Sequence, residues 1–423
     1  MALSSPLRAL RSRNYRLYFF GQLVSLLGTW MTQTATLWLV YHLSSSAFYL
    51  GLTGFVSQAP SFLLGPIAGT WVDRVDRHKL LVLTQALSML QSLTLAAFAF
   101  AGVIDVPHLL VLGALQGLIN AFDLPARQAL VVDFVENREH LGNAIALNSS
   151  MFNIARLAGP ALAGFIIAAK GPAVCYLVDG LSYLAVIASL LMMRFPPRER
   201  VGSTQRPLVE LAEGFRYTWQ HTPIRSIILL VTAVSFFGFS FSVLVPVFAR
   251  DVFHGDARTL GFLMSASGCG ALIAALFLTT RSGIGGLGKV IAVGGALLGV
   301  ALILFSRVDV LWLALPCMVG IGLGGVLLMA SSNTVVQTLV ENEKRGRVMA
   351  LFTMAFTGTA PVSALVMGWV AQRIGSATAL TIAGTLCLIA VWVFYRQLPR
   401  IRSAVANVHA ATTQVSPPVA AET

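Results

Sequence analysis

Charged residues are scarce in this chain. Asp, Glu, Lys and Arg make up 11% of its 423 residues, whereas soluble domains contain about 25%. Hydrophobic residues make up 56%, and the mean hydropathy is +0.78. Too few polar side chains are present to cover a water-soluble protein of this length. We therefore expect the chain to be solvated by a lipid bilayer.

Cysteine and metal-binding patterns are equally sparse. The four cysteines lie far apart in apolar segments, as small core residues do. Neither an H-E-x-x-H motif nor a Cys/His cluster occurs, so we expect no metal and no cofactor. The net charge of +12 comes from short basic groups spread between apolar runs, not from one patch. This spread argues against a nucleic-acid partner.

Long apolar runs are what the chain does contain. A helix needs about 20 apolar residues to cross a bilayer, and windows of that length predict an all-α membrane protein with twelve transmembrane helices. We place them near 16–43, 48–72, 79–102, 107–132, 142–169, 172–195, 224–249, 259–281, 287–306, 310–335, 347–373 and 376–396. The basic residues before the first window resemble a signal peptide, but no A-x-A site follows, so we expect it to remain as a span.

Basic residues predict the orientation. With the amino terminus in the cytoplasm, most of the 29 Lys and Arg lie at cytoplasmic ends of spans. The exceptions are Arg156, within a span, and five residues at the other side, Lys170, Arg250, Arg258, Arg307 and Arg373. We therefore expect both termini to be cytoplasmic.

The spans divide into two halves. Residues 196–223 contain several Pro and Arg and an amphipathic piece, LVELAEGFRYTW, that predicts a short surface helix. We expect four regions: a six-helix half at 1–195, a cytoplasmic connector at 196–223, a second six-helix half at 224–399, and a disordered cytoplasmic tail at 400–423.

A short internal repeat supports this division. The tripeptide VEN occurs at 135–137 and again at 340–342, each time between the fourth and fifth span of a half. Transporter folds are often built from such repeats.

The loop between spans 2 and 3 reads GTWVDRVDRHK. With twelve spans and two halves, this loop resembles that of the major facilitator superfamily, G-x-x-x-[DE]-[RK]-x-G-x-[RK]-[RK]. The matching residues are Gly69, Asp73, Arg74 and Lys79, with Arg77 just before the final pair. Asp76 stands where the family has its second glycine, and His78 replaces one basic residue.

The resemblance implies a major facilitator fold and a conformational role for this loop. Gly69 is expected to let span 2 approach a neighbour closely. Asp73 is expected to face the amino-terminal end of span 11, near 345–347, and to latch the halves together on the cytoplasmic side while the outer side is open. Arg74, Arg77 and Lys79 can pair with acids or anionic lipid. The alternative is an ordinary positive cytoplasmic loop.

Two further stretches resemble particular branches of that superfamily. ARLAGPALAG, at 155–164, is similar to a helix-packing motif of drug–proton antiporters, with Gly159, Pro160 and Gly164 as its main residues. NAFDLPARQALVVD, at 120–133, is similar to the bacterial branch that contains enterobactin exporters.

This resemblance implies an exporter in the bacterial inner membrane that moves a siderophore or drug-like amphiphile by proton antiport. The chain departs from many proton-coupled members in having Gly113 where they carry a basic residue.

Four ionisable residues lie deep inside the predicted spans: Asp123, Arg127, Arg156 and Asp179. Each costs about 2.5–3.5 kcal/mol on insertion scales, so paired or functional roles are the default. Asp123 and Arg127 are four residues apart on one helix face, and Pro125 between them should kink the helix. At 1.5 Å per residue, Asp123 lies about 14 Å and Arg156 about 21 Å from the cytoplasmic ends of their spans, a gap that a long Arg side chain could cover.

We expect these residues to bind protons or substrate, with Asp123 as the first proton carrier, Asp179 as the second, and Arg156 setting the affinity of the acid for a proton. The alternative is that they form structural ion pairs. Polar residues that could line a cavity are Gln22, Gln33, Asn333 and Gln337.

Other functions are less well supported. GIGGLGKV, at 283–290, has the G-x4-G-K spacing of a phosphate loop but lacks the following Ser or Thr and a preceding strand. An intramembrane enzyme would need a nucleophile–base pair, and a membrane sensor would carry a soluble domain; neither is found in the sequence. Proton-coupled uptake remains the alternative within transporters. We expect a monomer in the bilayer whose partners are a small molecule and protons.

Overall fold

The computed structural model of the chain describes residues 8–72, 74–134, 140–193, 207–281, 283 and 285–415. A short 3-10 helix, η1 (Arg8–Arg11), leads into six long helices. These are α1 (Arg13–Ser44), α2 (Ala47–Val72), α3 (Arg77–Phe100), α4 (Val106–Phe134), α5 (Leu141–Lys170) and α6 (Pro172–Met192).

The second half of the chain begins with α7 (Pro207–Gln220), an amphipathic helix too short to span a membrane. The helices that follow are α8 (Thr222–Phe237), α9 (Phe241–Val247), η3 (Phe248–Val252), α10 (Ala257–Thr279), α11 (Leu287–Phe305), α12 (Leu311–Leu339), α13 (Arg345–Thr353), η4 (Met354–Gly358), α14 (Ala360–Ile374) and α15 (Ser376–Val415).

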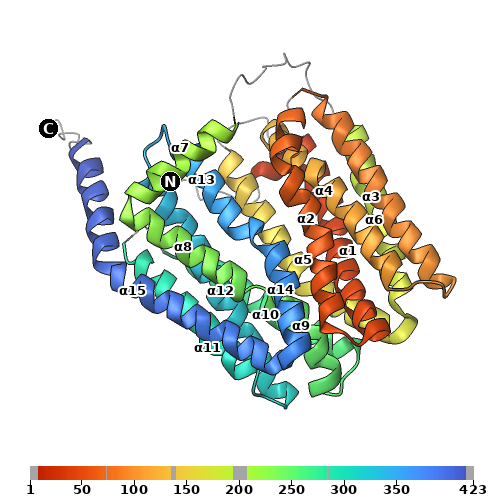
Figure 1. Ribbon diagram of the computed structural model, residues 1–423. Helices are drawn as coiled ribbons and strands as arrows, with labels where there is room; N and C mark the ends of the chain where they lie inside the picture. The colour runs from red at the N-terminus through yellow and green to blue at the C-terminus, as the bar shows by residue number, and fades with distance from the viewer. Residues whose placement is uncertain are drawn as a thin grey trace.

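The twelve predicted spans are confirmed, since twelve segments of the described chain are long and apolar enough to cross a membrane. Figure 1 shows them as two groups of helices side by side, α1 to α6 on one side and α8 to α15 on the other. The packing of the halves is equivalent: α2 lies on α4 as α10 lies on α12, and α1 lies on α6 as α8 lies on α15. Contact between the halves is made mainly by α5 with α10 and by α2 with α14.

Equivalent turns also relate the halves. Gly171 joins α5 to α6 with φ 80°, and Gly375 joins α14 to α15 with φ 86°. Both values lie in the left-handed region that glycine adopts without steric cost. The internal repeat is therefore visible in the backbone, although the first VEN lies outside the described residues.

Two spans are less regular than the sequence suggested. The seventh is broken between α8 and α9 at Gly238–Ser240 and ends in a π-helical turn, η3. The eleventh contains a second π-helical turn, η4, between α13 and α14. Such turns are rare and frequently mark functional positions.

The predicted tail needs correction. We expected 400–423 to be disordered, but α15 continues as a helix to Val415, and the remainder of the predicted tail, 416–423, lies outside the described residues. The stretch after Arg402 is rich in alanine, the strongest helix former, and this propensity outweighs its low hydrophobicity.

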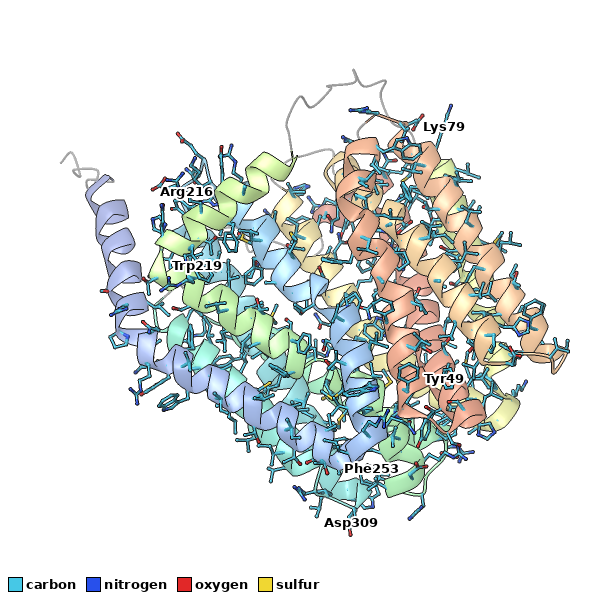
Figure 2. All side chains as sticks on the ribbon, in the orientation of Figure 1. Tyr49, Lys79, Arg216, Trp219, Phe253 and Asp309 are labelled. Atoms are coloured by element: carbon cyan, nitrogen blue, oxygen red, sulfur yellow. The ribbon has the colours of Figure 1, made fainter. Side chains whose placement is uncertain are left out.

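The bundle has two ends, which we name the α7 end and the α9 end. Figure 2 places Lys79 and Arg216 at the α7 end and Tyr49, Phe253 and Asp309 at the α9 end. The first turns of α3, α5 and α13 lie at the α7 end, because each follows a helix that runs from the α9 end.

Candidate functional site

Polar contacts join the two halves at the α9 end. The Tyr41 hydroxyl at the end of α1 donates to the Asp251 carboxylate in η3. Arg250 Nη1 donates to Tyr41 O and to Ser45 Oγ, at 3.2 Å each. Gln372 Oε1, on α14, accepts from Ser46 Oγ at 3.0 Å. Spans 1 and 2 are therefore tied to spans 7 and 11 at this end.

Close backbone contacts extend this closure into the bilayer. A β-carbon at Gly51 of α2 would lie 2.5 Å from Ala364 O of α14. At the contact between α5 and α10, a β-carbon at Gly164 of α5 would lie 2.7 Å from Ala257 O of α10. A β-carbon at Gly261 of α10 would lie 2.6 Å from Pro160 O of α5. Only glycine permits such an approach, as in other membrane helix pairs.

The helix-packing motif thus has two faces. Pro160 and Gly164 lie against the opposite half, whereas Gly159 packs inside its own half, where a β-carbon would lie 2.5 Å from Trp30 Cβ.

The contact between the halves ends part of the way through the bundle. Phe62 of α2 packs on Gly358 of η4, where a β-carbon would lie 2.4 Å from the ring. Nearer the α7 end, β-carbons at Gly65, Gly69, Gly142 and Gly346 would meet no atom of the described chain within 4 Å. The halves are therefore packed together at the α9 end and separate at the α7 end.

The separation of the halves at the α7 end affects the contacts of the loop between α2 and α3, which lies at that end. We expected Gly69 to lie close to a neighbouring helix, but in this conformation it does not, and the close approach on α2 is made by Gly51 instead. Asp73 lies outside the described residues. Arg347, at the start of α13, pairs with Glu213 of α7 in its own half. An engaged latch is not expected here, because its predicted role is to hold the α7 end closed.

The structure explains how Asp76 replaces the family's glycine. Asp76 has φ −69°, an ordinary value that needs no glycine, and it is the N-cap of α3. Its Oδ1 accepts from the backbone N–H groups of His78 (3.0 Å) and Lys79 (3.1 Å). The substitution therefore adds a helix cap, which the S/T/D/N preference at N-caps could have indicated from the sequence.

Arg156 lies on a polar stripe of α5. Gly159 packs on α1 and Leu157 on α10; at about 100° per residue, Arg156 lies between these two contacts together with Ser149 and Asn153. The opposite side carries exposed apolar residues, among them Leu162 (45%) and Phe165 (50%). A polar stripe between the two halves is the arrangement expected for a water-filled space rather than for lipid.

No ion pair or hydrogen bond of the Arg156 side chain is found in the described part of the chain. The predicted reach of Arg156 toward Asp123 is therefore not seen. Its guanidinium is a cation available to another partner.

The remaining cavity candidates differ in exposure. Gln33 and Gln337 are exposed, and Gln337 Nε2 donates to Asn333 Oδ1 at 3.2 Å, so Asn333 and Gln337 share one face of α12. Gln22 is only 3% exposed. It is thus a buried residue of α1 rather than part of an open surface.

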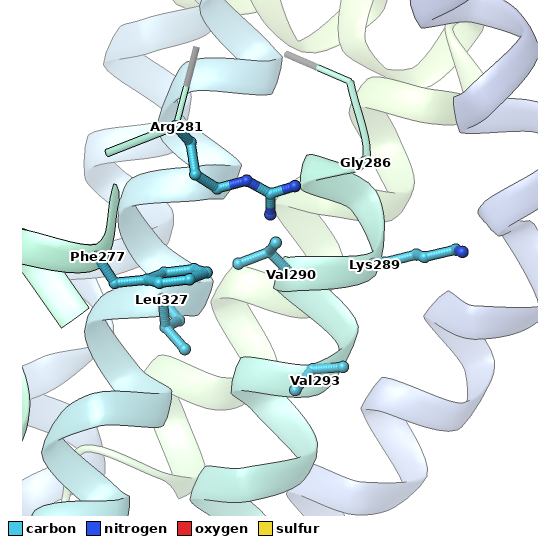
Figure 3. A pocket seen from close by; sticks show the side chains of 7 residues that line it. All are labelled: Phe277, Arg281, Gly286, Lys289, Val290, Val293 and Leu327. Atoms are coloured by element: carbon cyan, nitrogen blue, oxygen red, sulfur yellow. The ribbon is translucent and has the colours of Figure 1, made fainter. Parts of the chain in front are cut away.

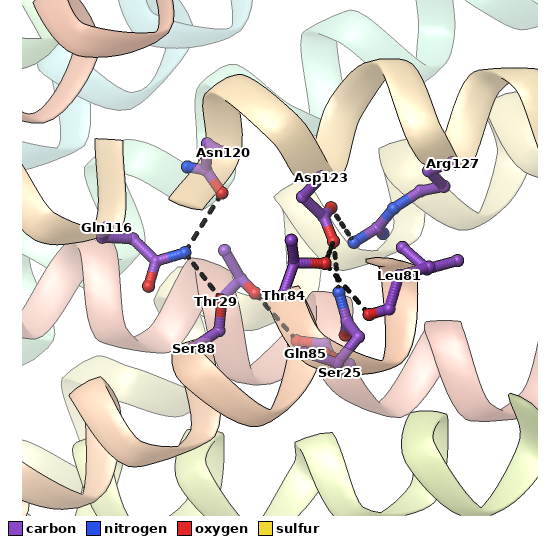
Figure 4. Close-up of polar contacts among 10 residues, drawn as sticks. All are labelled: Ser25, Thr29, Leu81, Thr84, Gln85, Ser88, Gln116, Asn120, Asp123 and Arg127. Carbon is purple, nitrogen blue, oxygen red and sulfur yellow. Dashed lines mark hydrogen bonds and ion pairs between the residues drawn. The ribbon is translucent and has the colours of Figure 1, made fainter. Parts of the chain in front are cut away.

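Asp123 lies inside the N-terminal half. Its Oδ2 pairs with Arg127 Nη2 at 2.5 Å, and its Oδ1 accepts from Thr84 Oγ1 (2.8 Å) and Gln85 Nε2 (2.7 Å) of α3. Figure 4 shows this cluster, which continues along α4 to Gln116 and Asn120. The i, i+4 pairing of Asp123 with Arg127 is as the sequence suggested, and both carboxylate oxygens are satisfied without Arg156.

Asp179 is buried with fewer partners. It lies on α6, and only 2% of it is exposed. Oδ2 accepts from Ser92 Oγ of α3 at 2.6 Å, while Oδ1 has no donor among the described residues. Gly28 of α1 packs against Asp179, since a β-carbon at Gly28 would lie 2.7 Å from Asp179 Oδ1. No Lys or Arg of the described chain pairs with this carboxyl group.

Comparison with known proteins agrees with this architecture. Residues 4–422 match the family described as transmembrane secretion effector. The chain is 27% identical over 393 residues to the staphyloferrin A transporter of Staphylococcus aureus (strain NCTC 8325 / PS 47), covering 91% of this chain and 97% of that one. It is 25% identical over 396 residues to the multidrug efflux pump Tap of Mycolicibacterium fortuitum, covering 91% and 96%.

Solved structures show the same fold at low identity. A POT family transporter in complex with 5-aminolevulinic acid superposes with a TM-score of 0.72 at 12% identity, over 92% of this chain and 97% of that chain. A bacterial homolog of the human lysosomal transporter Spinster gives 0.66 at 14% identity, over 94% and 98%. The twelve spans, the two equivalent halves and the match along nearly the whole sequence lead to one conclusion. The chain is a multi-pass membrane protein of the transmembrane secretion effector family in the major facilitator superfamily, a family of transporters and not of enzymes.

Proposed function

We propose that this protein exports a small amphiphilic molecule by proton antiport, with alternating access between its two halves. The observation that carries the proposal is the asymmetry between the two ends. The halves are joined at the α9 end by Tyr41–Asp251 and by Gly51 against Ala364, and they are apart at the α7 end. Arg156, in the middle of α5, and Gln337 of α12 lie on polar faces. This closure at one end is one of the two states that alternating access requires.

The orientation follows from the basic residues. The amino terminus of α1 and the first turn of α3 carry clusters of Arg and Lys, and both lie at the α7 end. By the positive-inside rule this end faces the cytoplasm of a bacterial inner membrane, with both termini inside. The described conformation would then receive its substrate from the cytoplasm, as an exporter must.

The substrate class is supported by the relatives. One is named for a siderophore, staphyloferrin A, and another for multidrug efflux, so we propose a siderophore or drug-like amphiphile. Between the halves, Arg156 and Asn153 offer polar contacts, and the exposed rings of Phe62 (38%) and Phe356 (37%) offer apolar ones. An amphiphile needs both kinds of contact.

The proton carrier is the second part of the proposal. A carboxyl group that is already paired with a cation and two neutral donors, as Asp123 is, gains little from protonation. Burying a charged carboxylate without a cation costs far more free energy than burying the neutral acid. Protonation of the buried Asp179 is therefore favoured. We therefore propose Asp179 as the first candidate and Asp123 as the second. Asp123 and Arg127 then stabilise the N-terminal half.

The proposal can be tested with the full-length protein in proteoliposomes. A panel of siderophores and drugs would be assayed in both directions, with and without a proton gradient. Gradient-driven movement away from the side of the α7 end supports export. Movement toward that side together with protons would establish uptake instead.

A further inference from the structure

A pocket in the C-terminal half lies away from the space between the halves. It measures about 410 Å³ and is lined by Phe277, Arg281, Gly286, Lys289, Val290, Val293 and Leu327. Helices α10 and α11 both pack against α12, and in Figure 3 the pocket lies between the side chains of α10 and α11 with Leu327 of α12 beneath. This volume is within the range of pockets that bind small ligands, about 300–1,000 Å³.

The walls of the pocket face the bilayer. Phe277 is 46% exposed and Val293 is 62% exposed, whereas Leu327 at the floor is 8% exposed. Other outward residues of the same two helices are also apolar, including Leu276 and Val300. In a membrane protein, exposed apolar side chains of this kind are solvated by acyl chains. The pocket is therefore a recess in the lipid-facing surface.

The part of the pocket rim that lies toward the α7 end carries two cations. Arg281 follows the end of α10, and Lys289 is in the first turn of α11. Arg281 lies with its guanidinium carbon 5.8 Å from the centre of the Phe277 ring, and Figure 3 shows it extending over Val290. No acidic residue pairs with either cation in the described chain, and the sequence from 257 to 308 contains no Asp or Glu at all.

We propose that this pocket binds an anionic phospholipid. Its phosphate would lie against Arg281, whose guanidinium extends over the pocket, and Lys289, which points to the other side of α11 in Figure 3, would add to the positive potential at the headgroup level. One acyl chain would follow Val290, Val293 and Leu327 toward the centre of the bilayer. Both cations lie at helix ends, which is the depth of the headgroups, and each is one helical turn or less from the apolar wall. Basic pockets between transmembrane helices are known to bind such headgroups.

This assignment also gives the GIGGLGKV stretch a role in lipid binding. Its lysine, Lys289, has the spacing of a phosphate loop, but the next residue is Val290 and the recess it borders is apolar. A soluble nucleotide would leave that apolar wall in contact with a polar ligand. A phosphate ester joined to an acyl chain satisfies both parts of the pocket.

The test compares lipids and variants of the full-length protein in detergent. Thermal unfolding and native mass spectrometry would measure retention of phosphatidylglycerol against phosphatidylcholine. Each basic residue near an anionic headgroup contributes about fivefold to binding, so Arg281→Gln with Lys289→Gln should weaken phosphatidylglycerol binding about thirtyfold. Arg396→Gln is the matched control, because this exposed Arg lies over Trp392 outside the pocket.

A second pair of variants leaves the charges intact. Val293→Trp should fill the pocket and reduce lipid retention, whereas Val300→Trp, seven residues further on the same exposed face of α11, should not. Unchanged preference for phosphatidylglycerol in both the double variant and Val293→Trp would overturn the proposal. Equal stabilisation by inorganic phosphate alone would also overturn it, because the site would then bind soluble anions.

Discussion

Replacing Tyr41 with Phe should weaken the closure at the α9 end. The Tyr41 hydroxyl donates to Asp251 of the other half, and the ring itself is only 4% exposed, so the variant loses the hydrogen bond but keeps the packing. Hydrogen bonds to charged groups contribute about 1.5–3 kcal/mol, and we expect about 1 kcal/mol here because Asp251 is exposed to water. Since 1.4 kcal/mol is tenfold, the ratio of the two states should shift about fivefold toward opening at this end.

The shift can be measured as a distance distribution. Spin labels at Leu43 (45% exposed) and Val310 (47% exposed) report on the two halves at the α9 end. Tyr49→Phe is the matched control: Tyr49 is 40% exposed at the same end, and its hydroxyl has no hydrogen bond in the described part of the chain. A longer-distance population that grows equally in both variants, or in neither, would refute the role of Tyr41.

Three further predictions concern orientation, the latch and the proton carrier. In a variant without its native cysteines, Glu343→Cys should resist impermeant thiol reagents in whole cells and Asp309→Cys should react; the reverse pattern would invert the topology. Asp73→Asn should reduce transport without loss of protein, and normal transport would leave this loop as positive-inside charge only. Asp179→Asn should abolish proton-coupled transport with the fold intact, and coupled transport by this variant would refute the role of Asp179 as carrier. Asp123→Asn should instead lower stability by about 2 kcal/mol, because it leaves the half-buried Arg127 without its counterion.

Much of the fold could be predicted from local pattern. The number of spans follows from the length of the apolar runs. The pairing of Asp123 with Arg127 follows from their i, i+4 spacing on one helix. The helix beyond Arg402 is not indicated by hydrophobicity, because this stretch is too polar to form a span; only its alanine content favours a helix. The break at Gly238–Ser240 could not be predicted, because the apolar residues around it continue the hydrophobic run without a strong interruption.

The contacts between the halves could not be predicted. Tyr41 and Asp251 are far apart in sequence, and nothing local to either residue indicates the other. In the described conformation Gly51, and not Gly69, makes the close approach on α2, and no local feature of the sequence distinguishes the two glycines. The isolation of Arg156 from Asp123 likewise depends on which face of α5 is turned toward α10.

The most direct test of the central claim is the direction of proton movement during transport. Proteoliposomes would be prepared with the α7 end outward and an acidic lumen, substrate would be added outside, and a lumenal dye would record pH. We predict that substrate enters as the lumenal pH rises, to about fiftyfold accumulation for one proton per substrate at about 100 mV. Substrate entry that leaves the lumenal pH unchanged, or that occurs only when protons enter with it, would contradict export by proton antiport.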